Sequence, residues 1–127
     1  MSVYDWETGW ENSAARPAPG TRLVEIAAIE EPGAKCLDYA EGEARFSLLV
    51  ARQDGEVRAY ENLCPHIRAP LETYDGEVRI VEKKYIMCAV HSACFRILDG
   101  SCLTGPALGQ SLKAFPIEVV DGWAVAA

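Results

Sequence analysis

The fold of this chain is decided by the stretch from Cys64-Pro65-His66 to Cys88-Ala89-Val90-His91, which holds two Cys–His pairs with 21 residues between His66 and Cys88. The 127-residue chain has only two histidines, and both belong to these pairs. Two thiolates and two imidazoles make a complete set of four ligands for a soft or borderline metal centre. The sequence therefore predicts one metal site assembled from two short segments.

Two kinds of metal centre take such ligands, and their usual spacings differ. A structural zinc site uses two sulfurs and two nitrogens, and its sequence usually opens with two cysteines and closes with two histidines. The alternative is a [2Fe–2S] centre in which two histidines replace two cysteines on one iron. Here each segment supplies one cysteine and one histidine. This alternation favours the binuclear centre, in which each segment gives a sulfur to one iron and a nitrogen to the other.

The order Cys-x-His, spacer, Cys-x-x-His resembles the Rieske-type [2Fe–2S] proteins, and the resemblance runs from about residue 22 to residue 126. Flanking residues extend it, namely Asn62, Ala69-Pro70-Leu71, Phe95, Gly105-Pro106-Ala107, Leu112 and Ala114–Val119. The resemblance implies one [2Fe–2S] cluster per chain. It also implies the ligands, with Cys64 and Cys88 on the buried iron and His66 and His91 on the outer, more exposed iron.

By this resemblance the chain is an electron carrier and not an enzyme. It would take one electron from a reductase and pass it to a separate terminal oxygenase, typically a ring-hydroxylating one. Once the cluster holds both histidines, none remains for the 2-His-1-carboxylate iron site of an oxygenase. Two other functions stay open: a Rieske-like small subunit of a larger reductase, such as nitrite reductase, and a redox-sensing or interaction domain.

The residues around the ligands predict a low reduction potential. High-potential respiratory members of the family carry an extra cysteine in each segment, joined as a disulfide, where this chain has Ala69 and Val90. Those members also carry a serine and a tyrosine that donate hydrogen bonds to cluster sulfurs, where this chain has Ala93 and Phe95. Because fewer donors leave the reduced cluster less stabilised, the resemblance implies the low-potential ferredoxin class.

Composition restricts the partners and the compartment. The chain has 19 acidic and 12 basic residues and a net charge of −7. This balance argues against nucleic acid or an anionic membrane and favours a protein partner with a basic docking surface. No apolar run reaches the length of a membrane span, and the N-terminus lacks the regions of a signal peptide. With an odd number of five cysteines, these features predict a cytoplasmic protein.

Strand periodicity and turn dipeptides predict an all-β domain. Residues 46–51 alternate as a strand does, and Asp-Gly turn signals recur at Asp54-Gly55, Asp75-Gly76, Asp99-Gly100 and Asp121-Gly122. The resemblance adds a Rieske-like architecture: an antiparallel β-sandwich base with a small inserted β subdomain, about residues 62–108, that binds the cluster. Phe115 and Trp123 are expected in the core of the base.

Residues 21–127 are expected to form this domain, and residues 1–20 an N-terminal extension that contains Trp6 and Trp10. The extension either packs on the domain or contacts a partner. The spacer between the Cys–His pairs is longer than in many relatives, and the extra length is expected in a hairpin over residues 72–84.

Three cysteines lie outside the ligand pattern: Cys36, Cys94 and Cys102. They are expected to be small apolar residues. A two-residue turn at Asp99-Gly100 would place Cys102 opposite Ile97, which argues against a disulfide between Cys94 and Cys102.

Overall fold

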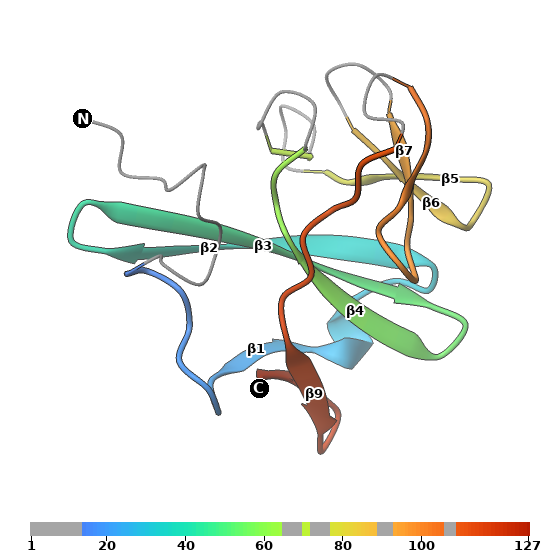
Figure 1. Ribbon diagram of the computed structural model, residues 1–127. Coiled ribbons are helices and arrows are strands. Elements are labelled where there is room, and N and C mark those ends of the chain that lie inside the picture. The colour runs from blue at the N-terminus through green and yellow to red at the C-terminus, as the bar shows by residue number, and fades with distance from the viewer. Residues whose placement is uncertain (1–13, 65–69, 72–76, 89–92, 106–108) are drawn as a thin grey trace.

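The computed structural model describes residues 14–64, 70–71, 77–88, 93–105 and 109–127. Within these ranges the chain forms ten β-strands in antiparallel sheets and one turn of 3-10 helix, which confirms the all-β prediction (Figure 1). The elements are β1 (Arg22–Glu25), η2 (Ile26–Ala28), β2 (Gly33–Glu41), β3 (Ala44–Gln53), β4 (Glu56–Glu61), β5 (Arg79–Val81), β6 (Tyr85–Met87), β7 (Cys94–Arg96), β8 (Cys102–Thr104), β9 (Ile117–Val120) and β10 (Trp123–Ala126).

The central layer is the sheet β2-β3-β4, and its middle strand β3 is covered on both faces. Phe46, Leu48 and Val50 pack into one core cluster, whereas Leu49 and Ala51 pack into a second cluster on the opposite face. All five side chains are at most 1% exposed. The sequence of a strand that is buried on both faces is an almost continuous apolar run, as it is for residues 46–51.

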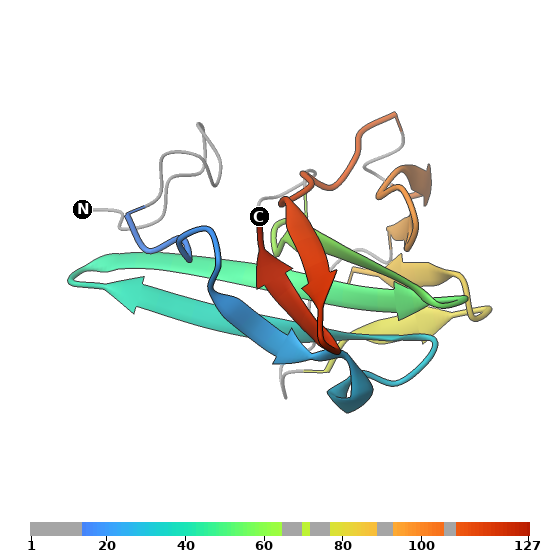
Figure 2. The same ribbon diagram turned by 90° about the horizontal axis from the view of Figure 1, so that it is seen from below.

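The sheet β1-β10-β9 covers one face of this central layer, and the two sheets form the expected sandwich base (Figure 2). Val24, Ala124 and Ala126 meet Phe46 in the core between them. Phe115 belongs to the same core, as predicted, with its ring centroid 5.8 Å from that of Phe46.

The prediction for Trp123 was wrong. Side chains alternate along β10, and because Ala124 and Ala126 point into the core, Trp123 points to the outer face of the sheet. There it is half-buried, and the guanidinium of Arg22 lies 5.3 Å from its ring centroid. Trp123 therefore makes a cation–π contact on the surface instead of filling the core.

The third sheet, β5-β6-β7-β8, covers the other face of the central layer. Ile80, Ile86, Phe95 and Cys102 pack from it against Leu49 on β3. In sequence this sheet lies between β4 and β9, as expected of a β subdomain inserted into the base.

The predicted turns at Asp54-Gly55 and Asp121-Gly122 are confirmed. Each dipeptide is the two-residue loop of a hairpin, and all four residues have positive φ, as a type I′ turn requires. A further two-residue loop at Gly42-Glu43, which carries no Asp-Gly signal, joins β2 to β3. Asp75-Gly76 lies outside the described residues.

The predicted register at Asp99-Gly100 was wrong. Cys102 pairs with Phe95 and not with Ile97, so the loop between β7 and β8 is wider than two residues. The carboxylate of Asp99 accepts hydrogen bonds from the backbone N–H and the hydroxyl of Ser101, at 2.9 and 2.6 Å. These bonds stabilise a turn that extends through Ser101.

Residues 14–20 pack on the base. Ala15 and Pro17 are buried, and Ala15 belongs to the core beneath the β1-β10-β9 sheet. The N–H of Gly20 donates to the carbonyl of Ala126 at 2.7 Å. Trp6 and Trp10 lie outside the described residues. No helix in the described ranges has the length and apolar character needed to cross a membrane.

Candidate metal centre

The structure brings the two predicted cysteine ligands into one buried core. Cys64 follows the end of β4, and Cys88 directly follows β6. Each is 1% exposed, and both belong to the core cluster between the central layer and the β5–β8 sheet. Two buried thiols in one core are a donor set that suits a thiolate-bound metal centre. His66 and His91 lie outside the described residues, two and three positions after these cysteines.

Asn62 closes the first cysteine loop. Its side-chain Oδ1 accepts a hydrogen bond from the backbone N–H of Leu71 at 2.9 Å, which joins the two ends of the segment that contains Cys64. Its Nδ2 donates to the hydroxyl of Ser47 on β3 at 3.0 Å. Asn62 is 1% exposed and Leu71 is fully buried. The loop is therefore fixed both to itself and to the central layer.

The second cysteine loop is closed through the backbone. The N–H of Cys88 donates to the carbonyl of Ala93 at 2.7 Å, and the next residues outward, Met87 and Cys94, pair in the β6–β7 ladder. Gly105 packs on this closure with φ of +99°, and a Cβ at that position would lie 2.8 Å from the Cα of Ala93. Only glycine combines this backbone conformation with so close an approach.

Tyr60 links the base to the β5–β8 sheet. Its hydroxyl donates to the carbonyl of Ile97 at 2.7 Å. Its ring packs directly on Gly100, because a Cβ at that position would lie only 2.8 Å from a ring carbon of Tyr60. Burial raises the pKa of Tyr60 to about 12, the charge of Asp99 adds to this effect, and the charge of Arg58 opposes it. The hydrogen bonds from Ser101 lower the pKa of Asp99, so its carboxylate stays ionised near the turn.

Of the remaining cysteines, Cys102 belongs to the same core and Cys36 packs against it. Cys102 is buried and its thiol donates to the carbonyl of Thr104 at 3.2 Å, whereas Cys36 and Cys94 are half-buried. All five cysteines fall within the described ranges, and none of them forms a disulfide. Cys94 pairs with Thr104 across the ladder, so it does not face Cys102.

The sequence singled out Asn62 as a flanking match, but it carried no signal for the role of Asn62 as a clamp. The partners of its side chain are nine and fifteen residues away, and only the folded chain brings them together. The parts played by Gly105 and Tyr60 were missed for the same reason.

The family model described as the Rieske [2Fe-2S] domain matches residues 23–116 of this chain. Among solved structures, the chain is similar to the Sphingomonas yanoikuyae B1 ferredoxin, with 27% identity and a TM-score of 0.62 over 84% of this chain and 96% of that one. It is also similar to the ferredoxin of carbazole 1,9a-dioxygenase from Nocardioides aromaticivorans IC177, with 21% identity and a TM-score of 0.66 over 86% and 98%.

A third similar structure is a complex of a carbazole-bound oxygenase and ferredoxin of carbazole 1,9a-dioxygenase, in which 82% of this chain matches 27% of a longer chain at 26% identity and a TM-score of 0.62. A comparison with curated protein sequences finds no significant match.

Proposed function

Because this chain belongs to the Rieske [2Fe-2S] domain family, we propose that it is an electron-transfer protein that carries one electron on a [2Fe–2S] cluster from a reductase to a terminal oxygenase. The observation that carries the proposal is the burial of Cys64 and Cys88 in a single core, each at the start of a loop that continues to a histidine. In this proposal Cys64 and Cys88 hold the inner iron, and His66 and His91 hold the outer one. The bound cluster would supply one-electron chemistry.

The described residues would position the ligands and exclude water. Asn62 holds the first loop closed, and the Cys88–Ala93 hydrogen bond holds the second. Phe95 and Ile86 belong to the same core cluster as both thiols and are fully buried. A dry, rigid surrounding keeps ligand geometry constant between the two oxidation states, which favours fast electron transfer.

The potential is expected to be low for this family. Ala93 is 1% exposed and Phe95 is fully buried, and neither side chain has a hydroxyl to donate to a sulfur. We expect protein-film voltammetry to place the potential in the ferredoxin range, and a potential in the respiratory range would contradict this reasoning.

The proposed partners follow from the chemistry of similar proteins. One similar structure is a complex of an oxygenase and a ferredoxin, which supports an oxygenase as the electron acceptor. The donor would be a separate reductase, and the cytoplasmic location expected from the sequence is part of the same proposal.

Electron paramagnetic resonance of the dithionite-reduced protein, with iron and sulfide assayed on the same sample, tests the cofactor. We expect a rhombic signal typical of mixed His/Cys ligation, with two irons and two sulfides per chain. Replacing Cys64 or Cys88 by serine should abolish the signal, whereas Cys36→Ser and Cys102→Ser should retain it. A silent spectrum with zinc in the sample would overturn the proposal.

A further inference from the structure

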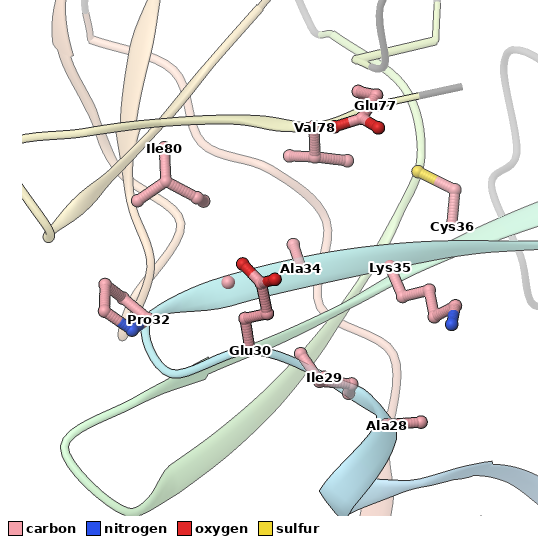
Figure 3. A pocket seen from close by; sticks show the side chains of 11 residues that line it. Ala28, Ile29, Glu30, Pro32, Ala34, Lys35, Cys36, Glu77, Val78 and Ile80 are labelled. Carbon is pink, nitrogen blue, oxygen red and sulfur yellow. The ribbon is translucent and has the colours of Figure 1, made fainter. Parts of the chain in front are cut away.

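A crevice of about 550 Å³ separates the beginning of β2 from the beginning of β5 (Figure 3). We call it the β2–β5 crevice. One wall is the turn from Ala28 to Gly33 with the first residues of β2, and the other wall is the segment 77–80. The crevice therefore lies where the base meets the β5–β8 sheet.

The crevice presents mostly polar surface, but four apolar side chains that line it adjoin the cysteine core. Ala34, Cys36, Val78 and Ile80 are partly buried and pack against the cluster of residues that includes Cys64 and Cys88. Figure 3 shows Val78, just before β5, and Ile80, on β5, on the wall opposite Ala34 of β2. A side chain that entered the crevice would therefore lie against residues that pack on the core containing both thiols.

The rim of the crevice is acidic. Glu30 is exposed, and Figure 3 shows its carboxylate standing between the two walls, while Lys35 points away from the opening. Glu77 contributes a second exposed carboxylate from the opposite wall. The neighbouring Glu31 contacts Arg52, but no ion pair of the described residues engages Glu30.

Glu30 is held in place by the turn that carries it. A Cβ on Gly33 would lie 2.5 Å from the carbonyl oxygen of Glu30, so the chain can turn this tightly only with glycine at that position. The carboxylate of Glu30 is therefore carried by a fixed backbone at the mouth of the crevice.

We propose that the β2–β5 crevice receives a basic side chain, arginine or lysine, from the surface of a redox partner protein. Apolar side chains such as Val78 and Ile80, set in a largely polar crevice with the carboxylates of Glu30 and Glu77 at its rim, match an aliphatic stem that ends in a cation. The net charge of −7 favours a partner with a basic docking surface. This inference rests on the proposed electron-transfer function and adds to it the place and the chemistry of docking.

The test uses cytochrome c, a basic one-electron acceptor, and the reduced holoprotein. Stopped-flow mixing at low ionic strength gives the second-order rate constant for cytochrome c reduction. Glu30→Lys reverses the charge at the mouth, and Ala34→Leu fills part of the crevice without changing charge. The control is Glu43→Lys, which makes the same change of charge in the exposed turn at the opposite end of β2.

We expect Glu30→Lys and Ala34→Leu each to slow the reaction about tenfold, and Glu43→Lys to slow it by less than about threefold. Equal effects of Glu30→Lys and Glu43→Lys would show that only net charge matters and would overturn the inference, as would a wild-type rate in Ala34→Leu. If Ala34→Leu loses its cluster, Glu30→Gln replaces it in the test. We expect Glu30→Gln to slow the reduction of cytochrome c several-fold, and a wild-type rate constant in this variant would overturn the inference.

The two proposals fail in different ways. Wild-type protein with the expected paramagnetic signal and fast reduction of cytochrome c, but with unaffected variants, would leave electron transfer intact and remove the docking site. Wild-type protein without that signal would remove the electron-transfer function itself.

Discussion

Replacing Asn62 by alanine should open the first cysteine loop without changing any proposed ligand. To the described residues, the side chain of Asn62 makes a hydrogen bond with the backbone of Leu71 and another with the hydroxyl of Ser47. Alanine removes both. Because Leu71 is fully buried, its N–H would lose its partner in a place that water reaches only if the loop opens.

The magnitude follows from these two contacts. A buried backbone N–H left without an acceptor costs about 1–3 kcal/mol, and the loss of the bond to Ser47 adds about 0.5–1.5 kcal/mol. The closed loop should therefore lose about 1.5–4.5 kcal/mol relative to the open one. If opening precedes cluster loss, even the lower figure makes loss roughly tenfold faster.

The assay is bleaching of the visible absorbance of the oxidised protein at a fixed, sub-denaturing urea concentration. Ser47→Ala is a matched control, because it removes only the weaker bond and should accelerate bleaching by roughly fivefold, equivalent to about 1 kcal/mol. Tyr60→Phe is a second control, since it removes a buried hydrogen bond outside the cysteine loops. If Asn62→Ala bleaches no faster than Ser47→Ala, Asn62 does not clamp the loop and the reasoning is wrong.

Two further predictions concern Gly105 and Tyr60. Gly105→Ala should strain a backbone of positive φ and also push Ala93 away, which lowers the iron content per chain. The control Gly109→Ala should cost only the strain of positive φ, about 1–2 kcal/mol. Equal iron content in the two variants would contradict the packing argument. Stability should fall between about pH 10 and pH 12, because the unfolded chain loses its phenol proton before folded Tyr60 does, and Tyr60→Phe should lack this part of the fall. Urea midpoints of both proteins at pH 9 and pH 11 check this, and parallel losses would refute it.

Local patterns predicted the elements whose surroundings are simple. The strand over residues 46–51 was predicted from alternation, and the structure confirms the strand, whose apolar side chains are buried on both faces. The hairpins at Asp54-Gly55 and Asp121-Gly122 were predicted because the dipeptide itself adopts the required positive φ. The shared core of Cys64 and Cys88 followed from the family resemblance, and the burial of both thiols agrees with it. The positions of His66 and His91 remain a prediction.

Other features depend on contacts that no local pattern contains. Strand β2 was not predicted, because it is an edge strand whose charged residues, such as Lys35 and Asp38, blur the alternation. Trp123 was assigned to the core by its size, but the alternation of β10 turns it outward. The register at Asp99-Gly100 failed because Ser101 joins the turn through the carboxylate of Asp99.

The layering of the sheets provides a site through which the protein can be attached to a surface. Strand β10 belongs to the sheet on one side of β3, and the core cluster that contains the two thiols lies on the other side. Ala127 is exposed just beyond that strand. A surface anchor attached there would hold the base toward an electrode or a resin and leave the β5–β8 sheet facing the solution.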